Sequence, residues 1–420
     1  MPDLCSLVER YRAIRAASLR NCEPLEAEDY CIQPMADASP PKWHLAHVTW
    51  FFETFLLKPF KAHYQAFHPR FEYLFNSYYN GVGQPYPRSE RGLLSRPTTE
   101  EVLEYRRYVD EAMLALLAES VEVQGAAELR FRTELGLHHE QQHQELFFTD
   151  IKYNLGNNPL HPAYVAGPTL VAETQVAPLK FKEFGGGIHE IGYGGEGFRF
   201  DNETPRHEVL LRNYALATRP VTNGEFLEFI ADGGYGRAEL WLSDGWASIN
   251  ANAIAAPLYW YRDGDAWHEY HLDGARPLCL AAPVCHVTGY EAAAYARWAG
   301  ARLPTEPEWE VASSSLALTG NFVESGPLRP RPDQDPGAGL HQVFGDVWEW
   351  TSSSYAPYPG FREFEGSLGE YNGKFMANQL VLRGGSCVTS ESHIRTTYRN
   401  FFYPKDRWQF TGIRLARDPD

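Results

Sequence analysis

The sequence predicts an α+β protein made of two different parts. In residues 1–158, four segments have apolar side chains that recur at helical spacing. Residues 159–420 are instead rich in glycine, proline and tryptophan, and they contain short strand-like runs with few helices. A chain of 420 residues and 47.7 kDa can bury the cores of two or three domains. We therefore expect a four-helix bundle over 1–158, followed by a domain of irregular β structure over 159–420.

Each of the four helices has its own signal. Apolar residues from Leu4 to Ile14 recur every three or four positions. The second helix should begin at Ser39, where serine can cap the helix and the following prolines fit its first turn. The third opens with a capping box at Thr98-Thr99-Glu100-Glu101. Four such helices fit an up-and-down bundle, which places functional side chains on facing helices.

The fourth helix carries the densest group of metal-capable side chains. His139 and His143 lie four residues apart, so their imidazoles project from one face of a helix and can bind a single ion. Gln142 shares that face, whereas the helical period turns Glu140 and His138 away from it. We expect His139 and His143 to be metal ligands, with Glu140 and His138 in supporting or structural positions.

Two other interpretations of this segment stay open. His139 to His143 matches the H-E-x-x-H pattern of zinc proteases, in which the glutamate activates water. One protease class needs a glycine where Leu146 stands, and the residues after Tyr153 read as a loop and not as a helix with a third ligand. A chance pair of histidines without metal is the other alternative.

The second helix offers a third ligand. Either His44 or His47 can face the bundle core, and a lone histidine there is more often a core residue than a ligand. A facing histidine pair changes that balance. Three imidazoles would leave about half the positions of an octahedral iron open, enough for substrate and O₂ together.

A long aromatic connection follows the second helix, over residues 71–83, and leads to Arg88 and Arg91. Long connections in compact domains are usually functional or disordered, and the aromatic content argues against disorder. It provides phenols for proton transfer, at Tyr78 and Tyr79, and guanidinium groups for a carboxylate. A packing loop with solvated arginines is the simpler alternative.

The second part should contain two helices, at Thr222–Ile230 and, capped by Thr288, at Gly289–Trp298. The strand-like run from Gly412 to Arg417 should close the fold. There is no tandem repeat.

Composition excludes several functional classes. A formal net charge of -16 and a pI near 5.4 argue against a nucleic-acid partner. The N-terminus lacks the apolar core of a signal peptide, and no run approaches 18 apolar residues, so we expect a cytoplasmic protein without a membrane segment. Six cysteines without a C-x-x-C pair read as buried thiols. The oligomeric state is not indicated.

Motifs in both parts carry a resemblance that covers nearly the whole chain. The first part, with Leu45-Ala46-His47 and His139 to His143, resembles a DinB-type metal-binding domain. The second resembles the formylglycine-generating-enzyme (sulfatase-modifying) domain, a C-type-lectin-like fold, through Arg219–Asn223, Ala301–Glu310, Gly345–Trp350 and Arg383–Ser386. In this order, the pair resembles the iron(II)-dependent sulfoxide synthases of ergothioneine biosynthesis, of the EgtB type.

This resemblance implies O₂-dependent joining of a thiol sulfur to the imidazole C2 of N-α-trimethylhistidine (hercynine), giving a sulfoxide. The family's Fe(II) ligands correspond to His47, His139 and His143. Three neutral imidazoles leave the iron dicationic, so that a cysteine thiolate can bind it. Gln142 is then placed to hydrogen-bond the substrate imidazole.

The remaining site residues also follow from the resemblance. Tyr78 or Tyr79 would supply a proton or hydrogen atom that directs the reaction to C–S coupling and away from thiol dioxygenation. The side chains of Arg88 and Arg91 would hold the carboxylate of the thiol substrate. Three further residues match the segment that holds the trimethylammonium betaine, for which aromatic faces are suitable partners: Asn400, Phe401 and Phe402.

Some alternatives remain within and outside the family. Phe402 is apolar where the γ-glutamylcysteine-using branch should have an acidic residue, which favours cysteine. Coupling of histidine at C5, as in ovothiol formation, or use of a selenium donor, as in selenoneine formation, stays open. A formylglycine-generating enzyme would need a second cysteine after Cys387, and none follows. A non-catalytic binding module is the last alternative.

Overall fold

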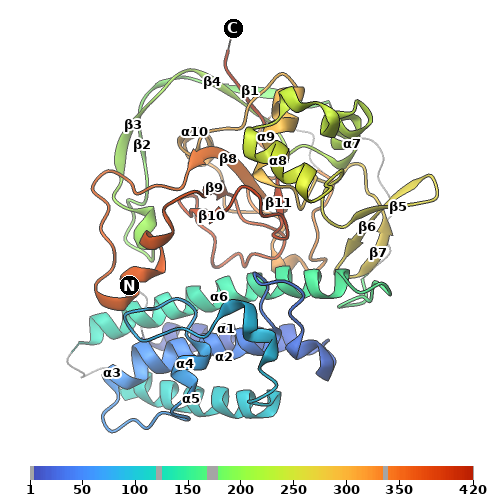
Figure 1. The fold of residues 1–420 in the computed structure, drawn as a ribbon. Helices are drawn as coiled ribbons and strands as arrows, with labels where there is room; N and C mark the ends of the chain where they lie inside the picture. Colours follow the sequence, from blue (N-terminus) through green and yellow to red (C-terminus); the bar gives the residue numbers. More distant parts are fainter. Residues whose placement is uncertain (1–3, 120–124, 168–177, 334–338, 420) are drawn as a thin grey trace. The chain divides into compact units, whose positions relative to one another are not determined.

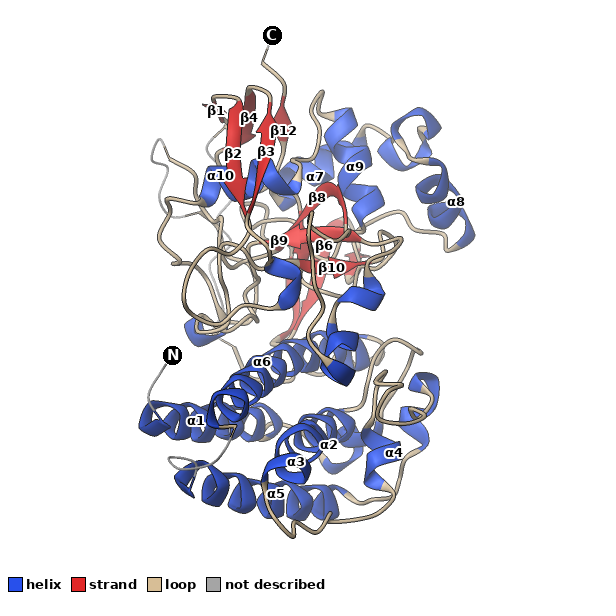
Figure 2. Ribbon diagram, turned by 90° about the vertical axis from the view of Figure 1, so that its left-hand side faces the viewer, coloured by secondary structure: helices blue, strands red, loops and turns tan. Residues whose placement is uncertain are grey.

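Helices form the first part of the chain, and short strands with a few helices form the second (Figures 1 and 2). This computed structural model describes residues 4–119, 125–167, 178–333 and 339–419. The predicted α+β fold class is confirmed. Within the described ranges, no helix has both the length and the apolar content needed to cross a membrane.

The chain divides into two units, which we describe separately. The helical unit comprises Met1–Pro159 and two later segments, Gly195–Phe200 and Glu363–Tyr371. The β-rich unit comprises Leu160–Gly194, Asp201–Arg362 and Asn372–Asp420. Residues that are distant in sequence therefore contribute to the helical unit.

Four longer helices carry the helical unit: α1 (Leu4–Cys22), α2 (Pro41–Phe52), α5 (Thr99–Glu119) and α6 (Ala126–Gly156). Helix α2 packs against α5 and α6, while α1 packs against α6 and α5, as expected for a bundle. Shorter elements connect them: η1 (Ala27–Cys31), η2 (Glu53–Leu57), α3 (Lys58–Phe60), α4 (Phe71–Phe75) and η3 (Arg88–Leu93). The late segment adds η8 (Gly366–Tyr371).

The helix starts agree with the sequence in one case and differ in another. At α5, the predicted capping box forms, because the amide of Glu101 donates to Thr98 Oγ1 and the Glu101 carboxylate accepts from the Thr98 amide. The predicted Ser39 cap of α2 is wrong, since Pro40 occupies the cap position. Ser39 makes other bonds: its amide donates to Asp150 (2.8 Å) and its hydroxyl accepts from Arg91 (2.8 Å).

A glycine brings α2 and α6 close together. A Cβ atom at Gly136 of α6 would lie 2.7 Å from a ring carbon of Phe52 and 3.2 Å from one of Phe51, both on α2. Because real Cβ atoms do not approach so closely, a side chain at position 136 would force these helices apart. The short spacing matters for the histidines one turn further along α6.

The described residues of the β-rich unit form four small sheets (Figure 2). Their orders are β1-β4-β12, β10-β9-β8-β11, β2-β3 and β5-β6-β7. The strands are β1 (Phe181–Phe184), β2 (Gly187–Ile191), β3 (His207–Leu211), β4 (Tyr214–Ala217), β5 (Trp260–Asp263), β6 (Ala266–His271), β7 (Gly274–Pro277), β8 (Trp348–Ser354), β9 (Leu380–Arg383), β10 (Asn400–Phe402), β11 (Thr411–Gly412) and β12 (Ala416–Arg417).

The helices of this unit are α7 (Asn223–Ala231), α8 (Ser243–Ala251), α9 (Gly289–Trp298) and α10 (Glu306–Ser313). Helices α7 and α9 confirm two predictions, and Thr288 caps α9 as expected. Helices α8 and α10 were not predicted. The predicted closing strand is also wrong in part: β11 and β12 are separate and pair in different sheets, because the chain leaves one sheet to join another.

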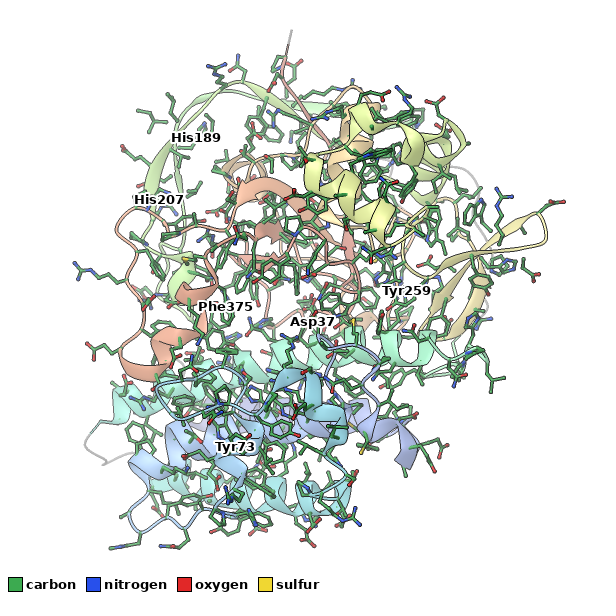
Figure 3. All side chains as sticks on the ribbon, in the orientation of Figure 1. Asp37, Tyr73, His189, His207, Tyr259 and Phe375 are labelled. Atoms are coloured by element: carbon green, nitrogen blue, oxygen red, sulfur yellow. The ribbon has the colours of Figure 1, made fainter. Side chains whose placement is uncertain are left out.

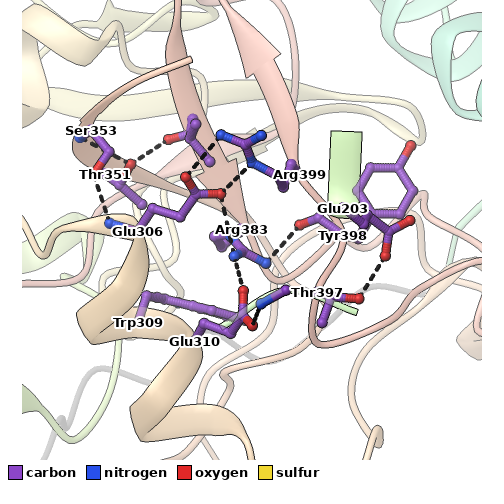
Figure 4. A network of polar contacts seen from close by, with 12 residues as sticks. Glu203, Glu306, Trp309, Glu310, Thr351, Ser353, Arg383, Thr397, Tyr398 and Arg399 are labelled. Carbon is purple, nitrogen blue, oxygen red and sulfur yellow. Dashed lines mark hydrogen bonds and ion pairs between the residues drawn. The ribbon is translucent and has the colours of Figure 1, made fainter. Parts of the chain in front are cut away.

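Buried ion pairs hold the centre of this unit (Figure 4). The guanidinium of Arg383 contacts Glu310 and lies 3.3 Å from Glu306, while Arg399 donates to Glu306 at 2.7 Å. Burial alone would raise the pKa of Glu306, but Arg399 and Arg383 lower it below its ordinary value. Charged residues of the motifs Ala301–Glu310 and Arg383–Ser386 thus form buried ion pairs. These residues therefore have a structural role.

Candidate metal centre

Three histidines of the helical unit meet at one point. His47 comes from α2, and His139 and His143 come from successive turns of α6; one ring nitrogen from each lies within 4.8 Å of the others. The Nε2 atoms of His47 and His139 are 3.2 Å apart. Of the two candidates on α2, it is His47 that joins the cluster.

The protonation of these three imidazoles suits the binding of a cation. His47 Nδ1 is 2.6 Å from the carbonyl oxygen of Phe75, to which it must donate, so its Nε2 carries a lone pair. Burial above all lowers the pKa of His47 and His143 far below the ordinary value, and it lowers the pKa of His139 to about 3. Three neutral imidazoles whose nitrogens converge suit a divalent transition metal.

An aromatic ring links this cluster to a buried arginine. The indole of Trp43 stacks on the His47 imidazole, with centroids 4.6 Å apart and planes within 10°. The guanidinium of Arg91 lies 3.3 Å from the centroid of the same indole, and Arg91 is only 4% exposed. Among the described residues, no carboxylate forms an ion pair with Arg91, and its Nε has no hydrogen-bond partner. Such a buried cation is a suitable partner for an anionic ligand.

Arg88 differs from Arg91. It is exposed, and its Nη2 donates to the backbone carbonyl of Asp37, a residue labelled in Figure 3. Its positive charge adds to burial in lowering the pKa of Arg91. Of the two predicted arginines, Arg91 is therefore the one joined to a metal-cluster residue, through Trp43.

Phenols gather beside the cluster. Tyr79 is fully buried, and it stacks on Tyr78 with its hydroxyl 3.5 Å from that of Tyr78. Its ring also packs on Trp50, whose own ring stacks on His47. Burial, and then the neighbouring Tyr78 and Tyr371, raise the pKa of Tyr79 well above the ordinary value, so this phenol keeps its proton.

Tyr371 was missed by the sequence reasoning. It ends η8, in the late segment of the helical unit; its hydroxyl contacts the side-chain oxygen of Gln142, and its ring centroid is 5.6 Å from that of His139. Glu370, beside it, accepts the amides of Asn80 and Gly81 and so ties this segment to the tyrosine loop. No local pattern signals this contact. The hydroxyl of Tyr398, by contrast, lies 3.1 Å from Nε2 of His393 in the β-rich unit.

Glu140 is structural. Its carboxylate accepts from Arg15 (2.9 Å), Arg106 (2.5 Å) and Ser18 (2.6 Å), and it is fully buried. Burial alone would raise the pKa of Glu140, but Arg106 and Arg15 outweigh it and lower the pKa to about 2. A carboxylate that is held by two arginines cannot activate water, so the zinc-protease interpretation is wrong. His138 also points away from the cluster and stacks on Phe198.

The predicted betaine segment lies in the β-rich unit. Asn400, Phe401 and Phe402 form β10, where Phe401 stacks on Tyr355 at 4.0 Å. The Asn400 side chain accepts the amide of Phe401. A role for these three residues in substrate binding stays a prediction.

Comparisons with known proteins agree with both units. Residues 10–147 match the DinB superfamily, and residues 184–335 and 333–419 match the sulfatase-modifying factor enzyme 1-like domain. The hercynine oxygenase of Mycolicibacterium thermoresistibile is 32% identical over 91% of this chain and 88% of its own length.

Two further hercynine oxygenases are similar to this chain. That of Mycobacterium tuberculosis is 31% identical over 96% of each chain. That of Mycolicibacterium smegmatis is 34% identical over 69% of this chain and 72% of its own length. The match extends across both units and includes a group of three histidines able to bind a metal. The chain belongs to the hercynine oxygenase family, a family of enzymes.

Proposed function

We propose that this protein is an iron(II)- and O₂-dependent sulfoxide synthase. It joins the sulfur of cysteine to the imidazole C2 of hercynine and releases hercynyl-cysteine sulfoxide. The observation that carries this proposal is the cluster of three neutral imidazoles, His47, His139 and His143, with a buried cation and protonated phenols around it. Iron(II) bound there supplies redox chemistry and open positions for a thiolate and O₂.

Arg91 binds the carboxylate of cysteine in this proposal. Its guanidinium is buried and lacks an ion-pair partner among the described residues, so a bound carboxylate would restore the balance of charge. Trp43 holds the guanidinium on one face and the imidazole of His47 on the other, which keeps the carboxylate site next to the metal cluster. Arg88, being exposed, contributes mainly through its charge.

In this proposal, Gln142 binds the imidazole of hercynine, and the tyrosines transfer protons. Gln142 follows His139 by three residues on α6 and bonds Tyr371, which orients its amide toward a substrate imidazole. Tyr79 holds its proton at Oη because burial raises its pKa, so it can donate during the O₂ step. Tyr78 bonds Tyr79 and can return the proton afterwards. Tyr371 is a third candidate donor.

The betaine end of hercynine is assigned to β10. Phe401 and Phe402 offer aromatic faces, which attract a quaternary ammonium, and Asn400 offers an amide. The apolar Phe402 supports cysteine as the thiol substrate, since an acidic residue is expected at this position in the branch that uses γ-glutamylcysteine.

The test is reconstitution with iron(II) under anaerobic conditions, followed by O₂ and defined substrate pairs. Cysteine, γ-glutamylcysteine and a selenium donor are each combined with hercynine or histidine, and the products are identified by mass spectrometry. We expect hercynyl-cysteine sulfoxide from cysteine and hercynine. A C5-linked histidine product, or turnover only with a selenium donor, would replace the proposal by the ovothiol-type or selenoneine-type reaction. If none of the pairs gives a product, the proposal is overturned.

A further inference from the structure

A second histidine of α2, beside His47, and a carboxylate of α6 lie next to the metal cluster. His44 of α2 places its Nδ1 atom 2.9 Å from Nδ1 of His143, and its Nε2 atom 3.0 Å from Oδ2 of Asp150. His44 and Asp150 are both buried, at 6% and 3% exposure. The three side chains form one line of hydrogen bonds that ends at a ring of the cluster.

The direction of these bonds follows from Asp150. Its Oδ2 atom already accepts the backbone amide of Ser39 at 2.8 Å, so this oxygen is an acceptor. His44 must therefore donate from Nε2, and a neutral His44 then has its lone pair on Nδ1. Since that nitrogen faces His143, His143 must donate from Nδ1. The lone pair of His143 is then on Nε2, the nitrogen left for a metal.

Packing alone does not hold these rings. Only a small cavity, of about 20 Å³, adjoins them, lined by His44, His143, Ser18, Cys22 and Phe147 among others. A flip of an imidazole exchanges nitrogen and carbon positions with almost no change of shape, so packing alone does not select its orientation. The bonds to Asp150 and His143 fix the orientation of His44 against this freedom.

We propose that His44 and Asp150 are positioning residues, which lock His143 in the tautomer and orientation that bind the metal. This inference rests on the proposed iron site. His44 is not itself a ligand: its two nitrogens are both engaged, and the cluster of three contains His47 instead. The partners of metal-bound histidines commonly change metal affinity 10- to 100-fold when they are removed.

Two substitutions at one position separate the hydrogen bond from the packing. In His44→Asn, the amide oxygen takes the place of Nδ1 and can still accept from His143. In His44→Gln, the amide nitrogen takes the place of Nε2 and faces Asp150, but no acceptor faces His143. His138→Asn is the matched control, because His138 is a buried neighbour of the ligands on α6 that stacks on Phe198 outside this line.

Metal affinity is measured on the full chain, by anaerobic titration of the metal-free protein with Co(II) and Fe(II). The visible spectrum of Co(II) also reports the geometry of its ligands. We expect His44→Gln to weaken binding 10- to 100-fold and to alter the Co(II) spectrum. His44→Asn and His138→Asn should stay within about 3-fold of the original chain. Equal weakening in Asn and Gln, or none in Gln, would overturn the proposal.

A second measurement needs no variant. In protein labelled with ¹⁵N-histidine, the ring-nitrogen shifts report which nitrogen of His44 carries hydrogen. We expect hydrogen on Nε2 of His44 and on Nδ1 of His143. The opposite tautomer of His44 would refute the proposed positioning role, even if all variants fold poorly. If the original chain binds no iron, the proposed function fails, whereas the tautomers of His44 and His143 still test the direction of the hydrogen bonds.

Discussion

Replacement of Glu140 by glutamine distinguishes a structural carboxylate from a catalytic one. The side chain keeps its size, but it loses the charge that pairs with Arg15 and Arg106 inside the helical unit. Because both arginines are buried, the neutral amide would leave Arg15 with Asp110 alone and Arg106 without a carboxylate partner among the described residues. We therefore expect Glu140→Gln to lower the stability of the helical unit.

The size of the effect follows from the pKa. For Glu140 the pKa is about 2 in the folded chain, against an ordinary 4.5. At about 1.4 kcal/mol for each unit, the ionised carboxylate contributes roughly 3 kcal/mol to the free energy of unfolding. Because the folded-state pKa is the lower one, this contribution is complete above pH 4.5 and is lost as the pH falls toward 2. By pH 3 it should be reduced by roughly half.

The assay is denaturant unfolding of the metal-free protein, followed by circular dichroism at 222 nm at several pH values. Glu128→Gln is the matched control on the same helix, because Glu128 pairs with Arg132 but its side chain is half-exposed. That control should change stability by less than about 0.5 kcal/mol. If Glu140→Gln unfolds like the original chain and yet abolishes activity, the structural interpretation is refuted.

Three other predictions concern the site. His139→Ala should abolish tight iron binding, as measured by metal analysis after gel filtration, while the helical circular dichroism stays unchanged. Arg91→Met should raise the KM for cysteine about 10- to 100-fold with little effect on the KM for hercynine, whereas Arg88→Met should change either by less than about 3-fold; equal effects on both substrates would contradict the carboxylate assignment. Tyr79→Phe should shift product from sulfoxide to cysteine sulfinate with iron still bound, and an unchanged ratio would transfer the donor role to Tyr371, tested by Tyr371→Phe.

Local patterns predicted the bundle and the position of its histidines. The four-residue spacing of His139 and His143 is a property of one helix, and the capping box at Thr98 involves neighbours in sequence. Such features need no knowledge of the rest of the chain. The choice between His44 and His47 was different, because both lie on one helix and only the facing helix decides between them.

What the sequence could not provide were contacts between distant segments. Tyr371 reaches Gln142 because its segment joins the helical unit, and no spacing rule relates the two residues. The pairing of Glu140 with Arg15 and Arg106 likewise requires three helices in register. Helices α8 and α10 were missed because they are short and contain Gly245 and Pro307, residue types that are typical of loops.

The late segment Glu363–Tyr371 is synthesised after the three histidines of the metal cluster. The ribosome releases α2 and α6, with all three histidines, long before it makes Tyr371; at ordinary elongation rates the delay is on the order of tens of seconds. A nascent chain can therefore gather its metal ligands while one phenol beside them does not yet exist. A chain that ended at Pro159 would lack this phenol permanently, so residues 1–159 alone would not contain the whole of the helical unit.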